Sequence, residues 1–252
     1  MNSNIHISAT IVVYKEDENI LQKTIVSFLN SPLSKKLFIV DNSPTNFLKR
    51  FCNFPEVEYI FIGKNIGFGC AHNLVLKKIK KESKYHLVLN PDVIFEPFVL
   101  PKLIEELKRN TRLALISPKV VYPNGEQQYT SRKYPTFLEL IYRRLGVFKR
   151  FTQQQEYINK DLNQAFYPEF FQGCFLFFNT KDFVAINGFD ERYFLYMEDV
   201  DICRKIDLLG KRKMYFPDVE ITHFHRRGSS QKGILLFHHV SSAIKYFKKW
   251  KN

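Results

Sequence analysis

The amino-acid sequence predicts an α/β domain in which helices cover both faces of a mostly parallel sheet. Strand-like apolar runs alternate with helix-like segments through the first half of the chain, and this alternation is typical of parallel sheets. The length of 252 residues suits one such domain with a large core, or two small domains. The sequence has no internal repeat and no Gly/Ser-rich linker, so we expect a single domain.

The first half of the chain accounts for most of the predicted sheet. Its strands are short runs of β-branched and aliphatic residues, and its helices repeat apolar residues every three to four positions. The predicted strands are Ile7–Val13, Leu37–Val40, Tyr59–Ile62, His86–Leu89 and Leu113–Ser117, and the predicted helices are Asn19–Leu29, Ala71–Ile79 and Val99–Leu107. Asp41, Asn65 and Asp92 follow apolar runs, at the strand ends where such sheets bind ligands.

The second half begins with a less regular segment. Residues 122–170 contain Pro123, Pro135 and Pro168, and we expect loops there with one helix near 137–148. The elements expected after it are the strand Phe175–Phe178, a helix near Asp182, a turn at Asn187-Gly188, the helix Asp199–Leu209, a strand ending near His223 and the C-terminal helix Ile234–Trp250.

The composition is that of a globular protein with a strongly basic balance. It is 45% hydrophobic and 25% charged, with a formal net charge of +13. Such a surface attracts nucleic acid, anionic lipid or phosphorylated small molecules, and charge alone does not choose among them. The four cysteines form no C-x-x-C pair, which favours a reducing compartment. We expect neither a signal peptide nor a membrane-spanning helix, and therefore a cytoplasmic location.

The segment Leu89-Asn90-Pro91-Asp92 places a carboxylate at the end of an apolar strand. Pro91 fixes the local backbone, so the carboxylate of Asp92 leaves the sheet at a defined angle. A divalent cation that bridges two phosphates needs one or two protein carboxylates. Asp92 is therefore a candidate ligand, although an aspartate in the turn after a strand is also common without any ligand.

A second acidic segment, residues 197–204, places three carboxylates where a helix is expected to begin. Acidic residues stabilise helix N-termini, and Asp201 could pair with Arg204 or Lys205, so a purely structural role is possible. The preceding residues 188–196 are rich in aromatic side chains. Crowded carboxylates beside apolar rings tend to have raised pKa values, which suits a general base. Glu198 and Asp199 are the candidates.

Two further segments carry polar groups after predicted strands. His223 and His225 would point to the same side of a strand, so either could be a metal ligand, and Arg226 and Arg227 could hold phosphate oxygens. A lone histidine is nevertheless more often structural. In residues 65–73, two glycines before a helix would let the backbone approach an anion. Neither G-x-G-x-x-G nor a P-loop is present, which argues against dinucleotide or ATP chemistry.

Taken in order, these segments resemble the family 2 glycosyltransferases of the GT-A fold, and within them the bacterial rhamnosyltransferase-like enzymes of O-antigen and related polysaccharide synthesis. The matching pieces are Ile11-Val12-Val13-Tyr14, Val40-Asp41-Asn42-Ser43, Asn65-x-Gly67-Phe68-Gly69, Leu89-Asn90-Pro91-Asp92, Gly173-Cys174-Phe175, Gly188-Phe189-Asp190-Glu191, Glu198-Asp199-Val200-Asp201 and His223. The resemblance covers nearly the whole chain. It implies one GT-A domain, with a nucleotide-binding half over about residues 1–120, an acceptor and catalytic half over about 121–230, and a basic helix over 231–252.

The resemblance also implies roles for particular residues. Asp199 would be the general base, assisted by Glu198, and transfer would proceed with inversion. Asp92 and His223 would hold Mg²⁺ or Mn²⁺, with Asn90 replacing the first aspartate of the family's D-x-D motif. The donor nucleotide would contact Tyr14, Glu16, Asp41, Asn65 and Gly67; Gly173, Asp201 and Arg204 would shape the acceptor site; His225, Arg226 and Arg227 would bind phosphate.

Two other functions compete with this interpretation. A nucleic-acid-binding protein would explain the charge, but the carboxylates gather after strand ends and no DNA- or RNA-binding motif is present. A non-catalytic nucleotide-sugar-binding protein would share the fold, but Glu198, Asp199 and Asp92 are all present. The donor is not readable from the motifs; the resemblance favours dTDP-L-rhamnose, and related enzymes use UDP-hexoses or UDP-galactofuranose.

A last hypothesis concerns the membrane. Residues 137–151 and the C-terminal run 246–251 combine apolar or aromatic residues with cations. Such segments can lie in the interface of an anionic bilayer. They would place the enzyme on the inner face of the membrane, close to a lipid-linked glycan acceptor. The alternative is that the apolar residues pack into the core and the cations are solvated.

Overall fold

The fold is built on one mixed sheet, and the computed structural model describes residues 5–137, 156–224 and 232–251 of the chain. Within these residues the strand order is β3-β2-β1-β4-β9-β6-β10-β5, and a separate pair joins β7 to β8. The strands are β1 (Ile5–Val13), β2 (Lys35–Asp41), β3 (Val57–Phe61), β4 (Ser83–Leu89), β5 (Val93–Phe95), β6 (Leu113–Val121), β7 (Ser131–Arg132), β8 (Phe170–Phe171), β9 (Phe175–Asn179) and β10 (Arg212–His223).

The first half of the chain forms a parallel block, as the alternation of strands and helices predicts. β1 pairs in parallel with β2 and β4, and β2 pairs in parallel with β3. In this register Val13 lies beside Asp41, and Asp41 lies beside Phe61. The carboxyl ends of the three strands therefore meet at one edge of the sheet, where their following loops gather.

The second half adds strands that run both ways. β9 lies between β4 and β6 and is antiparallel to both, whereas β6 and β10 are parallel. The short β5 pairs in antiparallel fashion with the end of β10, so that His223 lies opposite Val93. The strands predicted at 175–178 and before His223 are confirmed. The direction of β9 could not be predicted, because an apolar run shows the same pattern in either direction.

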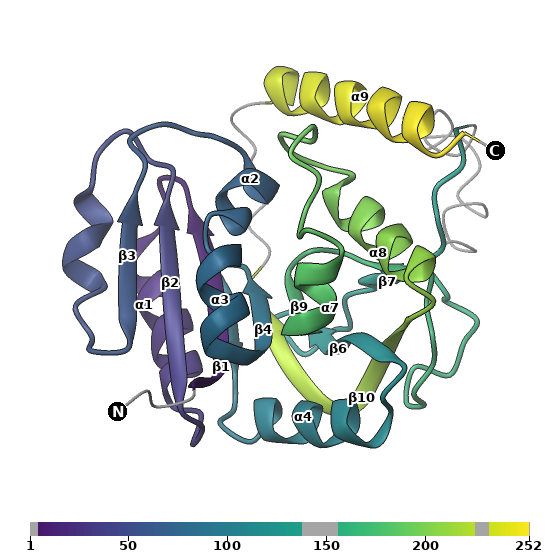
Figure 1. The fold of residues 1–252 in the computed structure, drawn as a ribbon, viewed down its shortest axis with the longest axis horizontal. Helices are drawn as coiled ribbons and strands as arrows, with labels where there is room; N and C mark the ends of the chain where they lie inside the picture. Colours follow the sequence, from purple (N-terminus) through teal and green to yellow (C-terminus); the bar gives the residue numbers. More distant parts are fainter. Residues whose placement is uncertain (1–4, 138–155, 225–231, 252) are drawn as a thin grey trace.

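Helices cover both faces of the sheet (Figure 1), and each face has its own apolar cluster. The helices α1 and α4 pack on one face, and α3, α7 and α8 pack on the other. The bounds are α1 (Glu18–Leu29), α2 (Phe68–Asn73), α3 (Leu76–Glu82), α4 (Val99–Arg109), α7 (Thr180–Ala185), α8 (Glu198–Leu208) and α9 (Lys232–Lys249), with a 3-10 turn η1 (Phe47–Phe51). Asp17 caps α1, because its carboxylate accepts hydrogen bonds from the backbone N–H groups of Asn19 and Ile20.

The helix predicted over residues 71–79 is divided into α2 and α3. Asn73 ends α2, and its side-chain amide donates a hydrogen bond to the carbonyl of Phe189 and accepts one from the N–H of Phe189, both 2.9 Å long. This pairing fixes the break between the two helices against the loop after α7. The sequence hides the break, because neither glycine nor proline occurs within residues 71–79.

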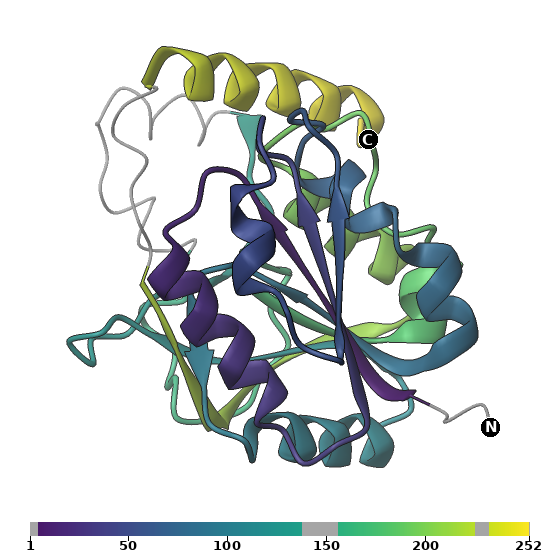
Figure 2. The same ribbon diagram turned by 90° about the vertical axis from the view of Figure 1, so that its left-hand side faces the viewer.

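Helix α9 lies across one end of the molecule, over α8 and the loop before it (Figures 1 and 2). It confirms the predicted C-terminal helix. In the described part of the chain no helix is both long and apolar enough to cross a membrane. The four cysteines are free thiols.

Candidate active site

The acidic turn, residues 194–199, delivers two carboxylates to the start of α8. Tyr196 and Met197 have φ angles of +68° and +67°, which non-glycine residues rarely adopt. Strained backbone of this kind persists where the surroundings hold it, and it concentrates at functional sites. Here the strain turns the chain so that Glu198 and Asp199 occupy the first turn of α8, where the helix dipole favours negative charge.

The loop before α2 holds this turn in place. The N–H of Phe68 donates a 3.1 Å hydrogen bond to the carbonyl of Phe194. Gly67 has a φ of +90°, and a Cβ at this position would lie 2.5 Å from the same carbonyl oxygen. Only glycine therefore fits here. Asn65 accepts a 3.0 Å hydrogen bond from the N–H of Gly67 and so shapes the loop.

Glu198 is buried, and its like-charged neighbour Asp199 is half-buried. Glu198 is 7% exposed, and its Oε2 has no hydrogen-bond partner among the described residues. Burial, and next the negative charge of Asp199, raise the pKa of Glu198 to about 8. Burial also raises the pKa of Asp199 to about 6, although the N–H groups of Val200 and Gly173 oppose the shift. Burial and crowding thus favour a pair that keeps a proton at a higher pH than ordinary carboxyl groups do.

Arg132 belongs to this site and was not predicted from the sequence. It lies in β7 and forms a 2.7 Å ion pair with Glu156. Its positive charge partly opposes the rise in the pKa of Asp199. The pairing of β7 with β8, with Arg132 opposite Phe170, fixes its position. A lone arginine in an irregular segment carries no sequence signal, because its position comes entirely from this tertiary pairing.

Asp92 and His223 form the second cluster of the site. His223 Nε2 lies 3.3 Å from Asp92 Oδ1, and the N–H of Phe224 donates a 3.0 Å hydrogen bond to the carbonyl of Asp92. The antiparallel pairing of β5 with β10 brings the two residues together. Burial lowers the pKa of His223, but Cys174 and Asp92 beside it outweigh burial and raise the pKa above its usual value.

This pair fits a divalent cation. Imidazole nitrogen and carboxylate oxygen are ligands of Mn²⁺, and they suit a site completed by phosphate oxygens and water. His223 Nδ1 lies 2.9 Å from Gln128 Oε1, and Gln128 Nε2 donates to the carbonyl of His223, so the ring is held with Nε2 toward Asp92. Among the described residues no set of three histidine, cysteine or acidic side chains is arranged to bind a metal.

The neighbouring residues Gly173 and Cys174 connect the two clusters. The N–H of Gly173 donates to the carboxylate of Asp199, and a Cβ at Gly173 would lie 3.7 Å from Asp199 Cβ. The side chain of Cys174 is hydrogen-bonded to His223. Adjacent Cα atoms are about 3.8 Å apart. The Glu198–Asp199 pair and the Asp92–His223 pair therefore flank the same short piece of chain, on which both clusters converge.

The residues predicted to contact the donor nucleotide lie at the ends of β1 to β3. Tyr14 and Glu16 are half-buried, and Asn65 is exposed. Asp41 is fully buried, and its carboxylate accepts hydrogen bonds from the N–H of Ser43 and from the Tyr59 hydroxyl. Asp41 thus supports the loop after β2, and a ligand would reach its carboxylate only if Tyr59 moved.

The pairing expected between Asp201 and Arg204 is wrong. Asp201 is fully buried and faces α9, where Lys249 Nζ lies 2.7 Å from its carboxylate and Trp250 Nε1 donates a 2.7 Å hydrogen bond to it. Arg204 instead donates to the Tyr246 hydroxyl at 2.6 Å. Helical spacing allowed the intrahelical pair, but α9 supplies nearer partners. Asp201 and Arg204 therefore attach α9 to α8.

Several expectations fall partly or wholly outside the described residues. His225, Arg226 and Arg227 lie there, and so does the helix expected near 137–148, except for Phe137. The C-terminal run does not form one basic aromatic surface, because Tyr246 is fully buried and Lys249 and Trp250 point inward to Asp201.

Known proteins with similar sequences are glycosyltransferases. The profile of Glycosyl transferase family 2 matches residues 8–175. The rhamnosyltransferase WbbL of Escherichia coli is 27% identical over 95% of this chain and 92% of its own length. N-acetylglucosaminyl-diphospho-decaprenol L-rhamnosyltransferase of Mycobacterium tuberculosis is 28% identical over 81% of this chain and 70% of its own.

Solved structures share the fold at lower sequence identity. GalNAc-T7 with UDP, GalNAc and Mn²⁺ superposes with a TM-score of 0.67 at 15% identity, covering 90% of this chain and 44% of that one. The mannosyltransferase PcManGT of Pyrobaculum calidifontis, in complex with GDP-Man and Mn²⁺, gives a TM-score of 0.64 at 14% identity, covering 95% and 64%. This chain thus spans only part of these larger proteins. It belongs to glycosyl transferase family 2, as a rhamnosyltransferase-like glycosyltransferase with the GT-A fold.

Proposed function

We propose that the protein is an inverting, divalent-metal-dependent transferase that moves L-rhamnose from dTDP-L-rhamnose to a hydroxyl of a lipid-linked bacterial glycan. The observation that carries the proposal is the convergence of the Asp92–His223 and Glu198–Asp199 pairs on Gly173 and Cys174. A sugar transferase needs one group to hold the donor's diphosphate and another to deprotonate the acceptor, on opposite sides of one reacting carbon. The Asp92–His223 pair suits the first role and the Glu198–Asp199 pair suits the second, and the two pairs lie close together.

Asp199 would act as the general base. Its raised pKa of about 6 leaves it ionised at neutral pH yet basic enough to accept a proton from a hydroxyl. The acceptor oxygen would bond to the anomeric carbon as its proton passes to the Asp199 carboxylate. The bond from that carbon to the diphosphate oxygen would break in the same step, and this single displacement inverts the centre. The raised pKa of Glu198 would help the pair to hold a single negative charge, which Asp199 would use as the base.

Asp92 and His223 would hold Mg²⁺ or Mn²⁺ beside the donor diphosphate. When bound, the cation would neutralise the negative charge that grows on the departing nucleoside diphosphate. Gln128 would keep the His223 ring turned toward the ion. GalNAc-T7 and PcManGT, which share the fold and were solved with Mn²⁺, support the proposal of a cation.

The donor and acceptor are proposed from the curated relatives. WbbL and the mycobacterial enzyme are both named rhamnosyltransferases, and the name of the mycobacterial enzyme describes a diphospho-decaprenol-linked acceptor. The Haloferax volcanii relative Agl10, 25% identical, is named a hexosyltransferase, so a hexose donor is the main alternative. A lipid-linked acceptor would place the protein peripherally on the cytoplasmic face of the membrane.

A donor panel tests this proposal. Purified protein is incubated with a polyprenyl-diphosphate-linked acceptor and, in separate reactions, with dTDP-L-rhamnose, UDP-glucose, UDP-galactose and UDP-galactofuranose. Nucleotide release and the mass of the product are measured. We expect acceptor-dependent release of dTDP and a product heavier by one deoxyhexose. Release only from a UDP donor would replace rhamnose, and no transfer from any donor would contradict the proposed function.

A further inference from the structure

Helix α9 has an inner side that is firmly bound to the acidic turn. The Ser242 hydroxyl donates a 2.8 Å hydrogen bond to the carbonyl of Leu195, and the ring of His238 stacks on Phe194 at 4.4 Å. His239 packs edge-on against Tyr196 at 5.2 Å. Together with the contacts of Lys249 and Trp250 to Asp201, these bonds tie α9 to the residues that position Glu198 and Asp199.

The outer side of α9 is apolar. Ile234, Phe237, Val240 and Ile244 are 59%, 69%, 46% and 48% exposed. Their spacing of three, three and four residues places them on one side of the helix. Four large apolar side chains with this much exposure, adjacent on one helix, form a patch rather than the scattered apolar residues of an ordinary surface.

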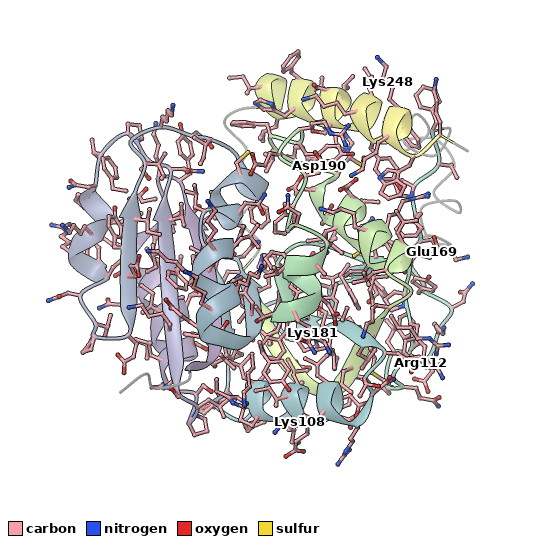
Figure 3. All side chains as sticks on the ribbon, viewed as in Figure 1. Lys108, Arg112, Glu169, Lys181, Asp190 and Lys248 are labelled. Atoms are coloured by element: carbon pink, nitrogen blue, oxygen red, sulfur yellow. The ribbon has the colours of Figure 1, made fainter. Side chains whose placement is uncertain are left out.

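Cations border this patch. Lys248 follows Ile244 by four residues, so it continues the same side of the helix, and Lys251 comes just after the end of α9; both are exposed. Figure 3 labels Lys248 on the outer side of α9 and Asp190 on the inner side. Residues 232–251 contain five lysines and no acidic residue. The outer face of α9, made of Ile234, Phe237, Val240, Ile244 and Lys248, with Lys251 directly after the helix, is thus both apolar and positively charged.

We propose that the outer face of α9 docks on an anionic lipid bilayer, with its apolar side chains in the headgroup boundary and its lysines among the lipid phosphates. This combination is the one that holds interfacial helices on membranes. A second copy of the chain would cover the apolar side chains, whereas an anionic bilayer accounts for both the apolar side chains and the lysines beside them. This surface replaces the run 246–251 as the membrane contact.

Docking through α9 would bring the active site close to the membrane. This consequence rests on the proposed lipid-linked acceptor. An α-helix is about 10 Å wide. With the outer side on the bilayer, the acidic turn lies about one helix diameter below the lipid headgroups, and a glycan on a lipid diphosphate reaches that depth. Helix α9 would thereby set the distance between the membrane surface and the proposed base, Asp199.

Vesicle flotation at low salt tests the docking directly, with vesicles of phosphatidylglycerol mixed with phosphatidylcholine and vesicles of phosphatidylcholine alone. We expect the wild-type protein to float with the anionic vesicles. Phe237→Glu/Ile244→Glu should reduce the bound fraction about tenfold or more. Lys248→Glu and Lys251→Glu should each reduce it about fivefold or more and weaken its dependence on salt.

Phe98→Glu is the matched control, because Phe98 is 51% exposed at the start of α4, at the opposite end of the molecule from α9. It should bind vesicles like the wild type, and thermal melting should show that every variant is folded. Nucleotide release with a water-soluble acceptor should be unchanged in all of them.

Three results would overturn the docking proposal. The first is a folded wild-type protein that does not float with anionic vesicles at low salt. The second is equal loss of binding in Phe98→Glu and Phe237→Glu/Ile244→Glu. The third is a dimer in analytical ultracentrifugation that these α9 substitutions abolish, which would assign the face to a second copy. Vesicle binding without transfer to any acceptor would instead contradict the proposed function and leave the docking in place.

Discussion

The two polar clusters of the site are both largely buried, yet they are built in opposite ways. Asp92 is paired with His223, a group that can carry the opposite charge, and the pKa of His223 is raised. Glu198 is beside Asp199, a group of the same charge, and both pKa values are raised. A carboxylate with a cationic neighbour is ready to exchange that neighbour for a metal ion, whereas crowded carboxylates are ready to take up a proton. The difference supports the proposed roles, in which Asp92 and His223 serve the leaving diphosphate and Glu198 and Asp199 serve the acceptor hydroxyl.

The largest expected effect comes from removing the base. Asp199→Asn should lower kcat by about 10²–10⁴-fold, because the amide cannot accept the proton, while donor binding stays nearly intact. Steady-state kinetics and calorimetric titration with dTDP measure the two quantities. Asp218→Asn is the control, since Asp218 is exposed on β10. Near wild-type kcat in Asp199→Asn would move the base to Glu198.

A substitution in the Asp92–His223 pair should instead weaken nucleotide binding. Asp92→Ala should weaken dTDP binding about 10–100-fold in the presence of Mn²⁺ and leave it unchanged in chelator, because the substitution removes a ligand only of the ion. Calorimetry under both conditions checks this, with Asp161→Ala, in an exposed turn, as the control. Equal weakening with and without Mn²⁺ would show that Asp92 contacts the nucleotide itself.

The like-charged pair should also appear in the stability of the fold. The pKa of Glu198 is raised in the folded state to about 8, so the folded state binds the proton more tightly than the unfolded chain does. Stability is therefore lost as pH rises between the ordinary glutamate pKa and about 8, by an amount on the order of a few kcal/mol. Glu198→Gln should flatten this loss in urea unfolding at pH 5 and pH 8. An equal slope in both proteins would contradict the raised pKa.

The smallest expected effect separates backbone strain from a steric clash. Gly67→Ala should destabilise the fold by about 1–3 kcal/mol, because its φ is positive and the new Cβ would meet the Phe194 carbonyl at 2.5 Å. Gly125→Ala is matched, with a φ of +84° and nothing within 4 Å of the new Cβ. Urea unfolding should show a smaller loss at Gly125. Equal losses would mean that the contact with Phe194 contributes nothing.

How much the sequence could predict differs between the same two clusters. Glu198 and Asp199 are neighbours in the chain, so their crowding was visible, and the aromatic residues before them indicated raised pKa values. The closeness of Asp92 and His223 depends on β5, a strand of three residues that leaves no periodic pattern. The resemblance to a family implied that pair, whereas residue patterns alone gave two unrelated candidates.

Contacts between distant elements explain most of what the sequence did not predict. Arg132 reaches the neighbourhood of Asp199 only because β7 pairs with β8. Asp201 pairs with Lys249, although Arg204 stands at helical spacing, because α9 packs on α8. The parallel block was predictable, since each of its strands is a separate apolar run. The partners of a polar side chain depend on which elements pack together, and local patterns carry no information about that.

The proposed division of roles requires a cation held at Asp92 and His223 during transfer. The direct measurement is transfer from dTDP-L-rhamnose to a polyprenyl-diphosphate-linked acceptor after treatment with excess chelator, followed by titration with Mn²⁺ or Mg²⁺. We predict no product in chelator, recovery as the free cation rises, and an inverted anomeric configuration in the product. Full activity in excess chelator would contradict the account, because the Asp92–His223 pair would then have no part in releasing the nucleotide.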